Sequence, residues 1–335
     1  SPLYNEFDLY LWNVNWGDCP FIDDDHSFIL KHKKLIDKHK LTEPPDIFIT
    51  MGLPKEFERI GKYTVGITAA CETDRISHQW IEKINNCCDV LFAISNWTAQ
   101  MIKGTFYQQK HLQNGPVLNK VQVTRPVGVW SPSVDTETFY PGIKYNLDLE
   151  FETNKNFIFV GHWLQGNYGK DRKNVGVLIR TFLQTFLGRE DVGLILKTSG
   201  AHYSLLDRSS IKNKIKSIKD TMIINPNKLS LPKIYFIHGE LTDSQMAQLY
   251  SHPSILSYVS PHHGEGWGMP ITEAMACNLP ALMTAWSGNT DYLKNEHFYP
   301  IDFKLEELAD DCLWDDIFIK SSQWAVINEE ILSRA

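Results

Sequence analysis

The chain of 335 residues carries 33 lysines and arginines against 40 aspartates and glutamates, a net charge of −7. Proteins that coat nucleic acid over a broad face need clustered cations, so this balance excludes that class. No apolar run approaches the roughly 20 residues that span a bilayer. At roughly 150 residues per domain, we expect about two globular domains.

Six cysteines are scattered along the chain, and none forms a spaced zinc pair. A chain of this length folds without disulfides, so we expect a reducing, cytoplasmic environment. No secretory or transit segment is visible. Because the chain starts at Ser1 and not at a methionine, the sequence leaves open whether further residues precede it.

The first half alternates short β-branched and aromatic runs with helical patterns, which is typical of βα units and a mainly parallel sheet. Strands are expected at 8–14, 46–50, 63–68, 89–95 and 120–125. Helices are expected at 27–39, 77–86 and 97–103. The fold class is therefore α/β.

The expected helix at 27–39 and the residue after it are rich in lysine, with Lys31, Lys33, Lys34, Lys38 and Lys40 interleaved with apolar positions. Charge runs on helices are usually solvated, and this is the interpretation we favour. The alternative is a peripheral contact between the 31–40 region and anionic lipid or an acidic acceptor.

Between 126 and 154 the periodicity lapses into proline, glycine, serine and polar residues, which indicates a domain boundary. We expect an N-terminal Rossmann-like domain at 1–130, a linker at 131–154 and a C-terminal Rossmann-like domain at 155–320. A C-terminal helix is expected at 321–335, and we consider its packing back on the N-terminal domain.

In the second half, strands are expected at 157–160, 192–197, 234–238, 255–259 and 281–284. Helices are expected at 175–187, 211–221, 243–251 and 270–277. Two doubly wound domains of this kind would bind a ligand in a central cleft, at the carboxyl ends of their parallel strands.

The most informative segment is the run 261–276, which has the pattern of strand end, glycine loop and helix. Gly264, Gly266 and Gly268 allow the backbone to approach a ligand closely. Free loop amides at a helix N-terminus favour a phosphate oxygen. Glu265 and Glu273 are poor partners for phosphate, so we expect them to accept hydrogen bonds from hydroxyl groups.

This segment resembles the E-x7-E motif of retaining GT-B glycosyltransferases of family 4, the glycosyl transferases of group 1. The resemblance implies that Glu265 contacts the donor sugar and Glu273 the nucleotide ribose. It also implies that the loop amides of Gly266, Trp267, Gly268 and Met269 hold the donor. The likeness is strong from Pro126 to about Leu293 and thin before Tyr63.

Residues 171–174, Asp-Arg-Lys-Asn, resemble the basic turn of the same family. The resemblance assigns the donor diphosphate to Lys173, with Arg172 as a weaker candidate. A cation here would stabilise the negative charge that builds on the leaving nucleoside diphosphate. The alternative is a solvated lysine at the start of a helix.

Two further positions are assigned less directly. Family members commonly carry an arginine where this chain has His162, and Lys197 is a candidate for the missing charge, with a surface lysine as the alternative. The segment around His238 resembles the part of the family that borders the nucleotide base. A histidine that satisfies itself at a strand end would look the same.

The N-terminal half offers Glu72 and Asp74, directly after an expected strand. Either side chain would orient an acceptor or donor hydroxyl or cap the loop. The acidic run Asp23, Asp24 and Asp25 precedes a helix and is interpreted as capping, so no obligatory metal is expected.

The sequence thus predicts a retaining, metal-independent transferase that moves a sugar from a UDP- or GDP-sugar to a hydroxyl of a glycan, lipid or other acceptor, with Glu265, Lys173 and Glu72 as catalytic residues. Three alternatives stay open. They are a sugar-nucleotide epimerase of GT-B architecture, an inactive nucleotide-sugar-binding module, and a transferase acting on modified DNA.

Overall fold

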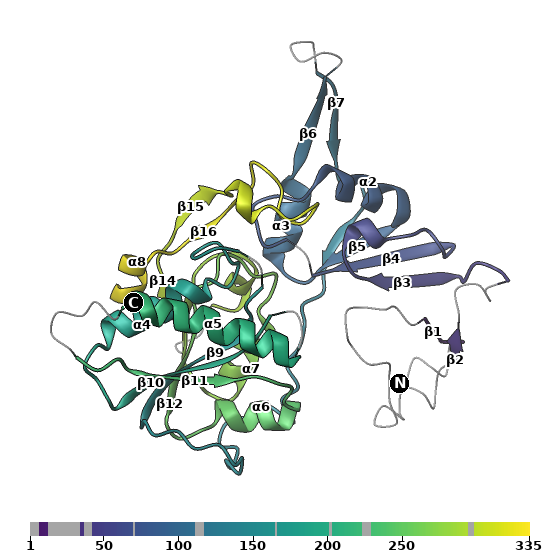
Figure 1. Ribbon diagram of the computed structural model, residues 1–335. Coiled ribbons are helices and arrows are strands. Elements are labelled where there is room, and N and C mark those ends of the chain that lie inside the picture. The colour runs from purple at the N-terminus through teal and green to yellow at the C-terminus, as the bar shows by residue number, and fades with distance from the viewer. Residues whose placement is uncertain are drawn as a thin grey trace. The chain divides into compact units, whose positions relative to one another are not determined.

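The computed structural model describes residues 7–12, 34–36, 42–69, 71–110, 117–164, 166–200, 203–222, 229–293 and 298–335 (Figure 1). The chain divides into two compact units, Ser1–Phe48 with Ile60–Tyr63, and Ile49–Arg59 with Thr64–Ala335. The first unit contains the short parallel strands β1 (Tyr10–Trp12) and β2 (Lys34–Ile36).

The helix expected at 27–39 is therefore wrong at Lys34–Ile36, where the backbone pairs with Tyr10–Trp12. Backbone pairing has overridden the amphipathic pattern at these three residues. The rest of this segment, with the other four lysines, lies outside the described residues, as do Asp23, Asp24 and Asp25.

The amino-terminal sheet has the strand order β3-β4-β5-β8. Its strands are β3 (Ile47–Met51), β4 (Tyr63–Thr68), β5 (Val90–Ala93) and β8 (Val127–Val129), of which the last three pair in parallel. Helices α2 (His78–Cys87) and α3 (Asn96–Gly104) follow β4 and β5, each with a serine N-cap. The core between the sheet and these helices includes Trp80, Ile81 and Ile84 of α2 and Leu91 of β5.

The strand expected at 120–125 does not close this sheet. It lies in β7 (Val117–Gln122), which pairs antiparallel with β6 (Phe106–Lys110), and the sheet is closed by β8. β8 was hidden in the glycine-containing stretch that reads as linker, since its three residues are too few to show an alternating pattern. β6 was missed because its sequence, FYQQK, is largely polar.

The carboxyl-terminal sheet has six parallel strands in the order β11-β10-β9-β12-β13-β14. They are β9 (Lys155–His162), β10 (Val192–Ser199), β11 (Lys233–Ile237), β12 (Ile255–Ser260), β13 (Ala281–Thr284) and β14 (Phe298–Ile301). Numbered along the chain, this is the 3-2-1-4-5-6 order of dinucleotide-binding domains. The α/β class with parallel sheets is thereby confirmed.

Helices cover both faces of this sheet (Figure 1). Helices α4 (Val175–Thr185) and α5 (Leu205–Thr221) pack on one face with Leu194 and Leu196 of β10. Helices α6 (Asp243–Tyr250) and α7 (Met269–Ala276) pack on the other face with Ile195. Alternate residues of one strand therefore serve two cores, as a doubly covered sheet requires.

The carboxyl-terminal segment is more varied than the single helix expected at 321–335. β16 (Gln323–Val326) pairs antiparallel with β15 (Lys304–Glu307), and only α8 (Glu329–Arg334) is helical. Leu332 of α8 joins the same core as α4. Gln323 exchanges hydrogen bonds with Asp74, which follows β4, at 2.6 and 3.0 Å.

Replacing Ile195 by alanine should lower the free energy of unfolding by about 2–5 kcal/mol, because a fully buried side chain leaves a cavity. Leu206→Ala is the matched control, since Leu206 is 84% exposed and its loss should cost no more than about 0.5 kcal/mol. Urea unfolding measures both. Equal midpoints for the two variants would contradict the assigned core.

Candidate functional site

The glycine loop lies where the strand order of the carboxyl-terminal sheet reverses. β9 and β12 are neighbours in the sheet, although five other elements separate them along the chain. Residues after β12 run from Pro261 to Gly268, and α7 begins at Met269. Gly268 has φ +89°, a conformation that glycine adopts without strain. Doubly wound sheets bind ligands at this reversal point.

Two of the loop glycines are required by the close approach of the segment after β4. A Cβ atom on Gly264 would lie 2.0 Å from the carbonyl oxygen of Glu72, and one on Gly266 would lie 2.3 Å from that of Ala69. A side chain at either position would clash with this backbone. The loop is therefore buried on this side, and Glu265 itself is 5% exposed.

Four charged side chains predicted from the sequence meet at the loop. Arg172 Nη1 lies 2.9 Å from Glu72 Oε1 and 3.2 Å from Glu265 Oε2. Lys173 Nζ pairs with the other oxygen of Glu265. Two carboxylates and two cations thus form a continuous network with no net charge.

This network decides the ionisation of its members. Burial alone would raise the pKa of Glu265, but Lys173 and Arg172 outweigh burial and bring the pKa down to about 2. Burial lowers the pKa of Lys173, against the attraction of Glu265. Burial also raises the pKa of Glu72, which Arg172 partly offsets. Glu265 is therefore a carboxylate held by cations.

The start of α7 presents free donors. Among the described residues, the backbone N–H groups of Gly266, Trp267 and Gly268 make no intramolecular hydrogen bond. Trp267 is held by its carbonyl, which accepts from the Tyr292 hydroxyl at 2.6 Å. Unpaired amides and the positive end of a helix dipole favour an anion.

Glu273 and Lys197 line a cavity of about 520 Å³. The other residues that line it are Val160, Tyr203, Glu240, Leu241, Thr242, Gln245 and Met246. The Tyr250 hydroxyl donates to Glu273 at 3.3 Å, and Lys197 Nζ lies 5.3 Å from the centre of the Tyr203 ring. Burial lowers the pKa of Lys197 and raises that of Glu273.

Two histidines that the sequence pointed to, His162 and His238, contact polar neighbours. His238 is not among the residues that line this cavity; its Nε2 lies 2.9 Å from Asp207 and its ring contacts Tyr203. His162 Nδ1 lies 2.9 Å from the Ser199 hydroxyl. Partial burial of its ring and the nearby Lys173 lower the pKa of His162, so it does not replace the charge of an arginine.

Tyr203, Glu240 and Gln245 were not singled out from the sequence. Gln245 was within reach, because Thr242 and Gln245 have the spacing of a capping box and form one at the start of α6. The capping box predicts where α6 begins, and Thr242 and Gln245 at this N-terminus line the cavity. Tyr203 precedes α5, in a region where the sequence shows no period.

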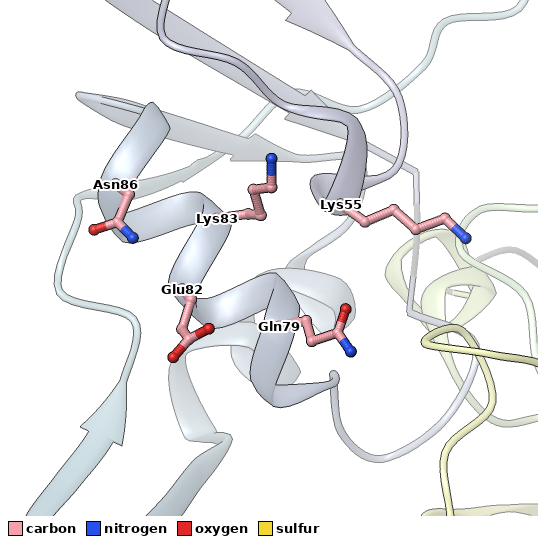
Figure 2. A pocket seen from close by; sticks show the side chains of 5 residues that line it. All are labelled: Lys55, Gln79, Glu82, Lys83 and Asn86. Carbon is pink, nitrogen blue, oxygen red and sulfur yellow. The ribbon is translucent and has the colours of Figure 1, made fainter.

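A smaller cavity of about 310 Å³ lies between η4 (Pro54–Glu56) and α2 (Figure 2). Lys55, Gln79, Glu82, Lys83 and Asn86 line it. Lys83 Nζ donates to the carbonyl of Phe57 at 3.3 Å. The four residues from α2 are all exposed, and a shallow hollow of solvated side chains gives no basis for a binding role.

Residues 224–311 match the family model of glycosyl transferases group 1. A probable sucrose-phosphate synthase of Thermosipho melanesiensis is 26% identical over 174 residues, which cover 52% of this chain and 36% of that protein. The match thus spans about a third of that relative. The resemblance to group 1 glycosyl transferases is confirmed over this part of the chain.

Two solved structures align with this chain. Sucrose-phosphate synthase of Thermosynechococcus elongatus aligns with a TM-score of 0.48 at 15% identity, covering 81% of this chain and 64% of that one. Anabaena HepE, solved with UDP and glucose, aligns with a TM-score of 0.46 at 13% identity, covering 71% of this chain and 58% of that one.

Within the described ranges, no group of three or more histidine, cysteine, aspartate or glutamate side chains is placed to hold a metal ion. The helices found there are also too short or too polar to cross a membrane.

Asp171 is the first residue of the basic turn and is hydrogen-bonded to the start of α4. Its Oδ1 accepts from the Val175 amide at 3.1 Å, while its Oδ2 is buried without a partner. Burial raises the pKa of this carboxyl to about 6. The folded chain therefore retains a proton at pH values where the unfolded chain has lost it, and stability falls as pH rises from about 4 to 6.

Asp171→Asn should remove this cost, because an amide keeps the acceptor for Val175 and carries no charge. We expect the variant to gain about 1–2 kcal/mol in the free energy of unfolding at pH 7, and nothing below pH ~4. Urea unfolding between pH 4 and 7 measures the difference, with exposed Asp148→Asn as control. A gain that does not change with pH would show that Asp171 is ionised without penalty.

Proposed function

We propose that this chain is a retaining, metal-independent glycosyltransferase of the GT-B type. It would transfer a sugar from a nucleoside-diphosphate sugar to an acceptor hydroxyl. The observation that carries the proposal is the loop between Glu265 and Glu273. Its free amides precede α7 at the reversal of the strand order, with Lys173 near one glutamate and the 520 Å³ cavity at the other.

The donor would occupy both sides of this loop. Glu273 would accept from the ribose hydroxyls in the cavity, and Lys197 would supply the positive charge that His162 lacks. The diphosphate would lie on the amides of Gly266, Trp267, Gly268 and Met269. Lys173, now satisfied by Glu265, would exchange this partner for a phosphate oxygen, and Glu265 would then accept from a sugar hydroxyl.

Transfer needs no enzymic nucleophile. The acceptor oxygen attacks the anomeric carbon as the bond from that carbon to the phosphate oxygen breaks, on the same face of the sugar. The proton of the acceptor hydroxyl passes to the departing diphosphate. Lys173 and the loop amides stabilise the charge on this leaving group, which is where the transition state differs most from the ground state.

The acceptor would approach from the side of Glu72. Arg172 holds this carboxylate within the network that contains Glu265. Glu72 would orient the acceptor hydroxyl, since an ionised carboxylate only accepts hydrogen bonds. We also propose a cytoplasmic location, because the described cysteines are free and a chain of this length folds without disulfides.

Lys173→Met should raise the dissociation constant of UDP, or of GDP, at least about tenfold, because a charge-assisted contact to phosphate is lost. Isothermal titration calorimetry measures it. Lys170→Met, in the same loop, is the matched control and should bind as the wild type does. Wild-type protein that binds neither nucleotide would refute the proposed donor site.

Glu265→Gln should reduce sugar transfer at least about 100-fold while UDP binding persists, because a neutral amide replaces the charged carboxylate that would accept from the sugar hydroxyl, while the phosphate contacts remain. Product formation from UDP- and GDP-sugars with a panel of acceptors is the readout. Exposed Glu306→Gln is the control, and circular dichroism checks the fold. Unchanged turnover would remove Glu265 from the reaction, and conversion of the sugar without an acceptor would identify an epimerase.

A further inference from the structure

Arg172 is tied to the glycine loop through both its backbone and its side chain. Its carbonyl accepts from the His263 amide at 2.8 Å, and its Nη1 donates to the Gly264 carbonyl at 3.2 Å. These two contacts are made with the two residues that immediately precede Glu265. The arginine is therefore fixed relative to the loop before any ionic contact is considered.

The same nitrogen then joins two carboxylates that come from distant parts of the chain. Nη1 lies 2.9 Å from Glu72 and 3.2 Å from Glu265. The side chain of Arg172 is 22% exposed, that of Glu72 21% and that of Glu265 7%. Without the guanidinium, Glu72 and Glu265 would repel each other at the edge of a buried site. Arg172 lies between the two carboxyl groups and offsets this repulsion.

These contacts also separate Arg172 from its basic neighbour. Within the described part of the chain, Lys173 makes one ion pair, with Glu265, and an ammonium group can exchange that partner for phosphate. The guanidinium of Arg172 instead serves three oxygen atoms, on Glu72, Gly264 and Glu265. Moving it to a phosphate would leave the Gly264 carbonyl and the Glu72 carboxylate without their donor.

We propose that Arg172 is a positioning residue that bridges the carboxylate of Glu72 to that of Glu265, and that it acts in the reaction through Glu72 and not by contact with the donor diphosphate. The catalytic role of Arg172 in this inference rests on the proposed function. The bridge itself is independent of that function.

The catalytic part is tested with a double-mutant cycle of Arg172→Ala, Glu72→Gln and the combined variant. UDP and GDP affinity is measured by calorimetry, and turnover by release of nucleoside diphosphate from UDP-glucose and GDP-glucose. Arg172→Ala should bind nucleotide within about threefold of wild type and lose about 10- to 100-fold in kcat. The double variant should be no slower than the slower single variant, because both changes remove one unit.

Arg172→Lys should recover part of the lost kcat, since it restores the charge but not the fork of donors. Lys170→Met is the control for a basic residue of the same loop. A rise of about tenfold or more in the nucleotide dissociation constant of Arg172→Ala would overturn the inference, because Arg172 would then contact phosphate. Multiplicative losses in the double variant would overturn it as well.

A nucleotide-free measurement separates this inference from the proposed function. Carboxyl-carbon NMR titration should show that Arg172→Ala raises the pKa of both Glu72 and Glu265, since each loses a neighbouring cation. A Glu72 titration that Arg172→Ala leaves unchanged would disprove the bridge. Raised pKa values together with a wild type that binds no nucleotide would confirm the bridge and refute the donor site.

Discussion

The ion network of Glu72, Arg172, Lys173 and Glu265 is the interaction on which the site depends. It joins a segment that follows β4 with the basic turn before α4 and the loop before α7. Because its members are largely buried, removing Arg172 would leave Glu72 without its cation, and removing Glu265 would leave Lys173 without its carboxylate. An unpaired buried charge costs more than the pair contributes when intact. The network therefore explains why Glu265 is held as a carboxylate close to a site suited to phosphate.

The fold places this network at the reversal of the strand order, and two residues beside it, Cys71 (φ +134°) and Asn174 (φ +56°), have positive φ angles. The strand order of the carboxyl-terminal sheet brings the ends of β9 and β12 together, and the basic turn and glycine loop are the connections that leave these ends. Gly264 and Gly266 have no side chain, and this allows the loop to lie directly against the backbone after β4. The free amides of Gly266, Trp267 and Gly268 belong to the loop that leads into α7, which begins at Met269.

Much of the carboxyl-terminal sheet was predictable, because parallel strands buried on both faces, such as β10, are long apolar runs. The grouping of Glu265 with Lys173 followed from the motifs. The contact between Arg172 and Glu72 could not be predicted, because a local sequence pattern does not indicate which side chains from distant parts of the chain meet. Short or polar strands, such as β8 and β6, also escaped, because their pairing comes from tertiary contacts and not from propensity. The pairing of His238 with Asp207 was not indicated by the sequence either.

A crystal structure of the chain with bound UDP tests the central claim most directly. We expect Lys173 to have left Glu265 for an oxygen of the diphosphate, with the loop amides of 266–268 on the same group and the ribose on Glu273. UDP bound elsewhere, with Lys173 still paired to Glu265 and the loop amides free, would contradict the assignment of this loop as a donor site.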